Sequence, residues 1–591
     1  MRLPIIKSKN IYMRETVAFG GLNLMQTFTE GELRDCSGVS HSLFPALTQR
    51  KFGKTVFKCD LPTAVIISEK ECIATENALY YDRKKVGTLT PGKKSMAQIG
   101  SKIVVFPDKV YYDIKTEKFG SIEGKCNLIN IAVTFTENSI TVPVDKYVKD
   151  SVTQMITLKK DSKVFKYTSA EIVAGKILLS GLSITDAGNL SAGDIFSEIS
   201  GNELYREVKE VTDKDLSVSV LNNCVRVKNV TKDIFVEFRE GDLITVKGIG
   251  SPNDGKEARI TQISGNTLLF EDGTFVSHKA TTEIEIMRKI PDFSFVCAYQ
   301  NRIWGSCGNT IYASKLGDPF NYYIYDNVAT DSYAVESNSP GEFTAAAVVG
   351  NSCLFFKQDR CYKLFGNRPA NFQLSENFCG GIQKEDRDSI VNLDGRIIYK
   401  GNGGIYSYYG GVPDCISYKV GNITMKNCVA GGNSHCYYIS ADTEKGREEF
   451  VYDLINGLWS KSGNKDVCGY FTNGENVYRL RKDRIEIISE KADKDAYWYA
   501  EFCPFDEKTF KGKDYVKLHI KAELFENAWI KAEIKSSDGP WKTVMTKYGN
   551  RKEYITIPCV LKNCREVKLR LSGKGRSTIE NIIREFSVNR R

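Results

Sequence analysis

Short runs of alternating apolar and polar residues, separated by tight turns, recur along most of this chain. The recurring phrase is an apolar run, a turn of Asn, Asp or Gly, and a second run rich in Tyr, Phe and Ile. Alternation with a period of two on either side of such turns predicts antiparallel hairpins. The phrase occurs at residues 98–114, 299–314, 348–366, 391–411, 431–461 and 470–488.

The spacing of the turns predicts how the hairpins are organised. From Gly350-Asn351 to Asp394-Gly395, and on to Asn473-Gly474, the turns follow a period of about 40 to 50 residues, the length of one four-stranded propeller blade. A set of short strands cannot bury both of its faces alone, so the copies are expected to stack around an axis. We therefore predict an all-β fold built on a β-propeller, with six blades.

The regular spacing of the turns is interrupted once and ends once along the chain, which predicts further domains. Between 125 and 288 the turns are irregular and aromatic residues are scarcer, which indicates an inserted β-barrel or β-sandwich. After about residue 491 clean alternation over roughly a hundred residues indicates a C-terminal, jelly-roll-like β-sandwich. The expected order is an N-terminal arm with a first strand (1–53), propeller (54–124), insert (125–290), propeller (291–491) and sandwich (492–591).

Composition adds a soluble, mixed surface to this picture. The chain has 591 residues, 41% of them hydrophobic, which is enough for a sizeable core. Its net charge of +9 comes from 82 basic and 73 acidic residues that are interspersed, so a solvated surface is favoured over a nucleic-acid groove. We find no apolar run of about 18 residues and no apolar segment after Met1, so no membrane anchor is expected.

The cysteines point to a reducing compartment. There are 17 of them, an odd number, and no C-x-x-C pair occurs. Cys297, Cys353, Cys436 and Cys468 fall in apolar strand runs, where a thiol acts as a small hydrophobic side chain. Free thiols in a chain folded in the cytoplasm are the expectation.

Motifs for catalysis, cofactors or metals are missing from the sequence. The four histidines, His41, His278, His435 and His519, have no metal-binding spacing, and they are expected to be structural. Neither G-x-S-x-G nor a phosphate-binding G-x-x-x-x-G-K-[ST] is present, and the glycine-rich stretch 401–411 is interpreted as a hairpin. We therefore predict no catalytic residue, no cofactor, no metal ligand and no enzymatic activity.

Two other functional classes remain open at this point. A glycan-cleaving propeller needs paired carboxylates, and the loop carboxylates that qualify by position are Asp318, Asp326, Asp331, Asp386 and Asp394. The same residue type is common at turns. Trp529 and Trp541 are placed either to stack on a sugar or in the sandwich core. A WD-type scaffold lacks its Gly-His and Trp-Asp pairs here.

Three stretches resemble one known family. They are AFGGLNLMQTFTEGELRDCSGVSHSLFPALTQR at Ala18–Arg50, NRIWGSCGNTIYASKLGDPFNYY at Asn301–Tyr323, and the pair LFFKQDRCYKLFG (Leu354–Gly366) and VNLDGRIIYKGNGGIYSYYGG (Val391–Gly411). They are similar to segments of the tail-tube nozzle proteins of short-tailed phages, also called tail hub or packaged-DNA stabilisation proteins. The similarity covers about Ala18–Glu123 and Phe293–Arg591, and the region Lys125–Arg288 departs from it.

The resemblance implies a structural virion protein assembled in the host cytoplasm. In that family a ring of propeller subunits, usually six, surrounds the tail channel below the portal and its adaptor. Genomic DNA passes through the lumen without sequence-specific binding, and tail fibres or a needle attach nearby. We expect a closed, head-to-tail homo-oligomeric ring in which the insert and the sandwich make most of the contacts. The main alternative is a glycan-binding or glycan-cleaving head.

Overall fold

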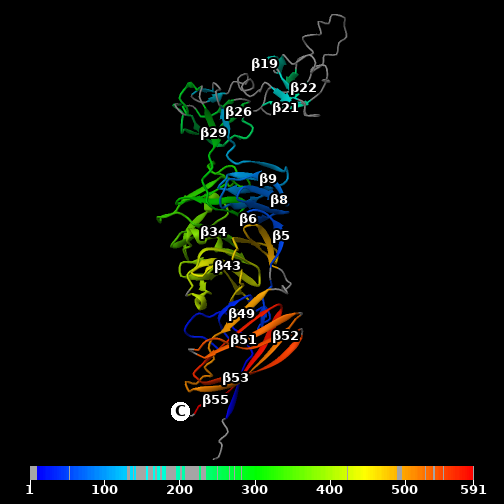
Figure 1. The fold of residues 1–591 in the computed structure, drawn as a ribbon. Coiled ribbons are helices and arrows are strands. Elements are labelled where there is room, and N and C mark those ends of the chain that lie inside the picture. Colours follow the sequence, from blue (N-terminus) through cyan, green and yellow to red (C-terminus); the bar gives the residue numbers. More distant parts are fainter. Residues whose placement is uncertain are drawn as a thin grey trace, which may run out of the picture. The chain divides into compact units, whose positions relative to one another are not determined.

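The computed structural model describes residues 10–128 except 52, residues 235–488 except 249–250, 265–266, 272, 281–282 and 422, and residues 496–589 except 526, 537–538 and 550. Between 129 and 234 it describes only strands β15–β23. Within these ranges the structure is almost entirely β (Figure 1), and its helices are three short 3-10 turns, η2 (Pro369–Asn371), η3 (Lys384–Ser389) and η4 (Tyr418–Val420). The predicted all-β class is confirmed.

Seven four-stranded antiparallel sheets share one design, in which the strands follow one another along the chain with one exception. The first sheet consists of β6 (Pro62–Ile67), β7 (Glu71–Thr75), β8 (Ala78–Tyr81) and β9 (Lys84–Thr88). The second consists of β10 (Ser95–Ile99), β11 (Lys102–Phe106), β12 (Val110–Asp113) and β13 (Lys118–Ser121). The third consists of β30 (Val296–Tyr299), β31 (Arg302–Cys307), β32 (Thr310–Ala313) and β33 (Tyr333–Glu336).

The other four sheets complete the set. They are β34 (Ala345–Val349), β35 (Ser352–Phe356), β36 (Arg360–Phe365) and β37 (Gln373–Gly380); β38 (Val391–Leu393), β39 (Arg396–Gly401), β40 (Gly404–Tyr408) and β41 (Asp414–Cys415); β42 (Lys426–Gly432), β43 (Cys436–Thr443), β44 (Gly446–Asp453) and β45 (Leu458–Lys461); and β46 (Gly469–Asn473), β47 (Asn476–Leu480), β48 (Arg484–Ile488) and β5 (Gly53–Lys58).

The first strands of these sheets form a closed cycle. Strands β6, β10, β30, β34, β38, β42 and β46 each pack beside the next, and β46 packs beside β6. Such a cycle of four-stranded sheets is typical of a β-propeller. Six blades were predicted, and the residues that the structure describes contain seven sheets of this design.

The glycine turns that revealed the repeat are required by backbone conformation. Gly350, Gly395 and Gly474 have φ values of +51°, +84° and +58° and lie in the turn that joins the first and second strands of their sheets. An added Cβ at each of them would meet nothing within 4 Å. These positions therefore favour glycine because of φ, and not because of close packing.

One sheet is closed by strands from distant parts of the chain. Strand β5 pairs antiparallel with β48, from Gly53 opposite Ile488 to Lys58 opposite Arg484, with one register shift. An N-terminal strand thus completes the sheet formed by the last three propeller-type strands. This pairing ties the two ends of the cycle together.

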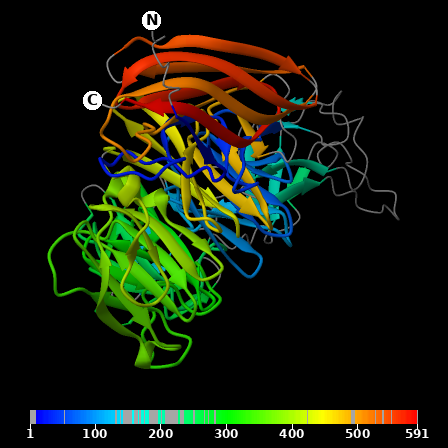
Figure 2. The ribbon, with the colours of Figure 1, turned by 90° about the horizontal axis from the view of Figure 1, so that it is seen from below.

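The C-terminal part forms two stacked sheets, which appear as long neighbouring strands in Figure 2. One sheet has the order β3 (Val39–Ser40), β4 (Leu47–Gln49), β55 (Ser577–Val588), β50 (Lys513–Leu524) and β53 (Lys552–Cys564), and β1 (Ile11–Thr16) also pairs with β55. The other has the order β2 (Leu33–Ser37), β49 (Tyr497–Phe502), β54 (Val567–Lys574), β51 (Ala528–Ser536) and β52 (Lys542–Gly549).

Strict alternation along these strands produces the core between the two sheets. Ile520, Ala522 and Leu524 of β50 face Ile530 and Ala532 of β51 within one buried cluster. The N-terminal segment belongs to this structure, because β1 and β4 pair with β55 and β2 pairs with β49. No local pattern predicts these pairings, which join residues more than 400 positions apart.

The chain divides into two compact units. The first contains residues 1–108, 292–312 and 334–591, and the second contains residues 109–291 and 313–333. One sheet of the second unit has the order β14 (Cys126–Leu128), β29 (Ile284–Arg288), β24 (Leu243–Lys247) and β25 (Glu257–Arg259). Another has the order β26 (Gln262–Ser264), β27 (Thr267–Leu269), β16 (Ser139–Thr141), β15 (Val133–Thr136) and β28 (His278–Ala280).

The remaining strands of the second unit form two more groups. Strand β17 (Met155–Thr157) pairs with β18 (Val164–Lys166), and a five-stranded sheet has the order β19 (Ser169–Val173), β20 (Lys176–Ser180), β23 (Val225–Val227), β22 (Asn202–Tyr205) and β21 (Ile195–Ile199). In the second unit, strands β24 and β29 contribute to a buried core that includes Phe235, Phe238, Ile244, Val246 and Ile286.

A buried ion pair joins two neighbouring propeller-type sheets. Glu449 of β44 accepts hydrogen bonds from Arg479 of β47 at 2.6 and 3.0 Å, and neither side chain has any solvent exposure. Tyr470 donates to the same carboxylate at 2.6 Å and Asn464 at 2.8 Å, and Ser462 also donates to it. Although burial opposes it, the Arg479 guanidinium and these donors lower the pKa of Glu449 to about 2.

Candidate functional site

The four histidines have separate structural partners. His41 is buried, its Nε2 lies 3.0 Å from the Gly20 carbonyl oxygen, and burial lowers its pKa to about 4. The His278 ring lies 3.0 Å from the Ser251 hydroxyl. His435 lies in the turn before β43, and its ring contacts the Ser434 hydroxyl. In β50, the His519 ring lies 2.9 Å from Thr556 and 2.8 Å from Glu585.

The five loop carboxylates considered for glycan cleavage belong to different parts of the structure. Asp318, Asp326 and Asp331 belong to the second unit, whereas Asp386 and Asp394 belong to the first and line two different cavities. Each has a local role. Asp318 accepts bonds from the Phe320 amide and the Asn321 side chain at 3.0 Å, which shapes the turn of the GDPFNYY segment.

The other members of this group are engaged as well. Asp326 forms a bidentate pair with Arg259 at 2.7 and 2.9 Å, and Asp331 accepts the Val328 amide at 3.0 Å. Asp386 accepts the Cys428 amide at 2.9 Å, and Asp394 occupies a left-handed turn position at φ +52°. Turn and ion-pair roles therefore account for all five.

Trp529 and Trp541 are half-buried on the outer face of the sandwich, and not in its core. Trp529 alternates with the buried residues Ala528 and Ile530 of β51, and its ring meets Tyr497 edge-on at 6.3 Å. The Trp541 ring has the Arg570 guanidinium over it at 4.3 Å and the Lys535 ammonium at 5.8 Å. A cation already covers the face of Trp541 that a sugar would need.

The interior of the strand cycle contains a narrow cavity. It has a volume of about 450 Å³ and is lined by residues of the first strands, among them Met96, Val296, Ala346 and Ala430. A volume in this range is the size of a small-molecule site.

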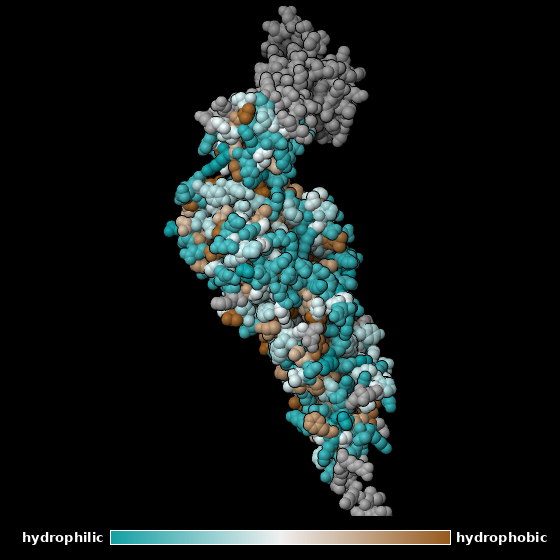
Figure 3. Space-filling model, turned by 90° about the vertical axis from the view of Figure 1, so that its left-hand side faces the viewer, coloured by the Kyte–Doolittle hydropathy of each residue, from teal (hydrophilic) through white to brown (hydrophobic). Residues whose placement is uncertain are grey.

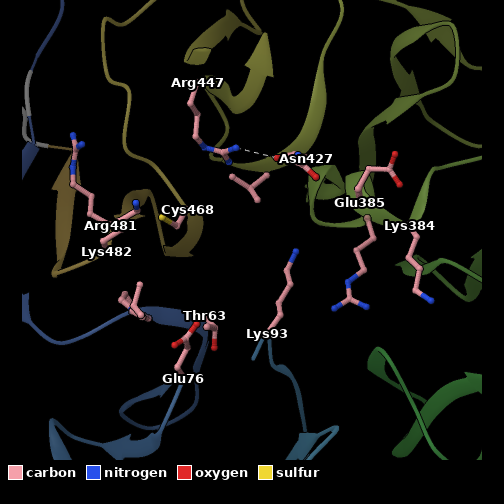
Figure 4. Close-up of a pocket in the computed structure, with 14 residues that line it drawn as sticks. Thr63, Glu76, Lys93, Lys384, Glu385, Asn427, Arg447, Cys468, Arg481 and Lys482 are labelled. Carbon is pink, nitrogen blue, oxygen red and sulfur yellow. Dashed lines mark hydrogen bonds between the residues drawn. The ribbon is translucent and has the colours of Figure 1, made fainter. Parts of the chain in front are cut away.

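A larger pocket opens where connections lead into the first strands. It has a volume of about 730 Å³, and its lining includes six basic and two acidic side chains: Lys93, Lys384, Arg387, Arg447, Arg481, Lys482, Glu76 and Glu385 (Figure 4). Apolar wall is supplied by Leu61, Pro62, Val429 and Cys468. We call this cavity the basic pocket.

The basic pocket is assembled from connections that are far apart in sequence. Leu61 and Thr63 lead from β5 into β6, Lys93 lies between β9 and β10, and Lys384 lies in η3 before β38. Arg481 and Lys482 form the turn between β47 and β48. The sequence analysis missed this site because no local motif brings these residues together.

Several of its cations are already paired. Arg447 bonds Asp442 at 2.9 Å, Arg481 bonds Glu486 at 2.6 Å, Lys384 pairs with Glu342 at 2.8 Å, and Lys93 pairs with Asp388. Burial opposes ionisation of Asp442, but hydrogen bonds from Asn427 and Arg447 still lower its pKa. These carboxylates lie outside the pocket lining, so they fix the cations in place and offset much of their charge.

Among the side chains that the structure describes, no group of three or more His, Cys, Asp or Glu is arranged to hold a metal ion. In that part of the chain, no helix is long and apolar enough to span a bilayer.

No protein-family model matches the chain, and no curated protein is similar to it in sequence. Among solved structures, an exo-β-1,3-galactanase of Phanerochaete chrysosporium is 11% identical with a TM-score of 0.17, covering 49% of this chain and 95% of that one. PorZ of the type-IX secretion system of Porphyromonas gingivalis is 8% identical with a TM-score of 0.23, covering 90% of this chain and 77% of that one. Likenesses this low carry no argument about function.

Proposed function

We propose that this chain is a non-enzymatic, ring-forming structural subunit of a tailed-phage virion, located at the tail nozzle or hub. In this proposal the seven four-stranded sheets form one seven-bladed propeller, and the ring extends the DNA channel below the portal and adaptor. It assembles in the host cytoplasm and provides attachment for fibres or a needle. The sequence resemblance supports the family, and the structure supports a role in assembly.

The observation that carries the assembly role is the exposed edge of the sandwich. Among the described strands, β1 pairs only with β55, so its other edge is unpaired. Ile11, Tyr12 and Met13 of this strand are 58%, 48% and 68% exposed. An unpaired edge that carries large apolar side chains is a ready site for pairing with another chain.

The narrow propeller interior constrains where DNA would pass. A cavity of about 450 Å³ inside the strand cycle leaves no passage for a duplex within one chain. In the proposed ring, the lumen is therefore formed between copies. Polar and apolar side chains are intermingled on the face seen in Figure 3.

Sedimentation of the purified full chain over a range of concentrations tests this proposal. We expect a closed oligomer that the double variant Ile11→Lys/Met13→Lys converts to monomer, because two charges on an exposed edge oppose pairing. Val412→Lys is the control, since Val412 is 76% exposed in the loop between β40 and β41. A wild-type chain that stays monomeric at every concentration and in the presence of phage tail particles contradicts the proposal.

A glycan-binding role is the second candidate, and a groove on the same sandwich favours it. The groove has a volume of about 360 Å³ and is lined by Met13, His519, Tyr554, Asn581 and Glu585, among others. Tyr554 is 75% exposed, and polar groups surround it, as in many sugar sites. Binding to host surface polysaccharide that Tyr554→Ala abolishes would support this candidate over the structural one.

A further inference from the structure

Two arginines of the basic pocket are held rigidly while each keeps one free nitrogen. Arg447 donates a hydrogen bond from Nε to the Val467 carbonyl oxygen at 2.6 Å. Its Nη1 donates to the Asp442 carboxylate at 2.9 Å and to the Asn427 carbonyl oxygen at 3.2 Å. Its Nη2 bonds none of the residues that the structure describes. Because the guanidinium is fixed before any ligand arrives, little side-chain entropy is lost on binding.

Arg481 is arranged in the same way. Its Nε bonds Glu486 at 2.6 Å and its Nη2 bonds Asn464 at 2.7 Å. Nη1 has no hydrogen-bond partner within the described parts of the chain. A second prepositioned donor is therefore available at the pocket wall.

The neighbouring lysine has no partner at all among the described side chains. Lys482 is exposed, lines the pocket, and its ammonium forms neither a hydrogen bond nor an ion pair with them. Figure 4 shows Arg447, Arg481 and Lys482 on the side of the pocket where Cys468 lies. Burial raises the pKa of Cys468, and the charges of these three residues act in the opposite direction.

The backbone beneath this cluster adopts a strained conformation. Leu61 has φ +44°, in the left-handed region that a leucine rarely occupies. Its amide donates to the Lys482 carbonyl at 2.7 Å, and its own carbonyl accepts the Glu76 amide at 3.1 Å. Retained strain of this kind is concentrated at ligand sites.

We propose that Arg447, Arg481 and Lys482 form a binding site for an oxyanion group, a phosphate or a carboxylate, on a small ligand. Guanidinium and ammonium groups are the donors that recognise such oxygens, and charge-assisted bonds are the strong ones. Specificity arises from the fixed donors and not from net charge, since Asp442 and Glu486 offset two of the cations. The pocket lining contains no aromatic ring on which a base or sugar would stack.

The two acidic residues in the pocket lining provide a second test of the site. The side chains of Glu76 and Glu385 bond none of the described residues, and both residues line the same pocket (Figure 4). A carboxylate that faces the ligand repels an oxyanion. Removing that charge is expected to strengthen binding, whereas removing Lys482 is expected to weaken it.

Isothermal titration of the full chain with inorganic pyrophosphate and, separately, with citrate tests the site and distinguishes phosphate from carboxylate ligands. We expect at least one of them to bind at millimolar concentration or below. Lys482→Ala is expected to weaken binding about tenfold, and Glu385→Gln is expected to strengthen it severalfold. Lys511→Ala, an exposed lysine of the sandwich, is the control and leaves the affinity unchanged.

The proposal fails if neither anion binds, or if Lys482→Ala and Lys511→Ala behave alike. Because Lys482 and Glu385 have no described side-chain partner, their variants keep the fold, and a melting curve checks this. The site goes beyond the assembly role and is independent of it. A chain that forms rings without binding either anion overturns only this inference, and one that binds an anion as a monomer overturns only the assembly role.

Discussion

Replacement of Glu449 by glutamine tests how two adjacent propeller-type sheets are held together. The carboxylate is fully buried and accepts two bonds from Arg479, which is itself fully buried. Glutamine keeps the volume and removes the charge. Arg479 would then be left as a buried cation without a counter-ion, although it keeps its place 5.8 Å from the Tyr438 ring.

The expected magnitude follows from two independent routes. The Glu449 pKa is lowered from 4.5 to about 2, which corresponds to about 3 kcal/mol of stability. Breaking a buried pair by removing one partner typically costs about 3–5 kcal/mol. We therefore expect Glu449→Gln to destabilise the fold by about 3 kcal/mol, or about 6–12 °C in melting temperature for a cooperative region of this size.

The pH dependence of this effect has a definite sign. A carboxylate whose folded pKa is depressed contributes stability that is present above its unfolded pKa and is lost as the pH falls through the folded value. The difference between wild type and Glu449→Gln is therefore constant above pH 4.5 and shrinks as the pH falls toward 2. Thermal melts by circular dichroism at several pH values measure it.

Two further variants make the experiment decisive. Glu444→Gln, in the exposed turn between β43 and β44, is the matched control and is expected to change stability by less than about 0.5 kcal/mol. The double variant Glu449→Gln/Arg479→Met removes both charges and is expected to recover part of the loss. If Glu449→Gln melts with the control, or if its deficit is the same at pH 3 as at pH 7, the reasoning is wrong.

Three other predictions concern packing, the N-terminal segment and the thiols. Gly381→Ala places a Cβ 2.2 Å from the Gln358 backbone and is expected to cost about 1–3 kcal/mol, whereas Gly411→Ala meets nothing within 4 Å and is expected to melt like the wild type. Arg584 bonds Glu507 at 2.7 Å and Thr16 at 2.8 Å, so Arg584→Met should accelerate proteolysis near residue 16, with unchanged cleavage contradicting the contact. Burial raises the pKa of Cys36 and Cys72 to about 12, so maleimide labelling followed by mass spectrometry should modify exposed Cys307 and Cys415 first.

Local pattern was sufficient for the elements of this protein. Alternation with a period of two identified the strands, and turn residues such as Asp394-Gly395 identified hairpins, because both depend on neighbours within a few residues. The all-β class follows from these alone. Asp318 and Asp394 were also assigned correctly to turns as one of two alternatives, since a short carboxylate side chain caps a turn without help from distant residues.

Tertiary structure decided everything that depends on which distant strands meet. The pairings of β5 with β48 and of β1 with β55 bring together strands that are more than 400 residues apart in the chain. The residues of a strand edge do not specify which distant strand will pair with it. The basic pocket likewise exists only because separate connections converge at one end of the strand cycle, so Arg447 and Lys482 looked like ordinary surface charges until the fold brought them together.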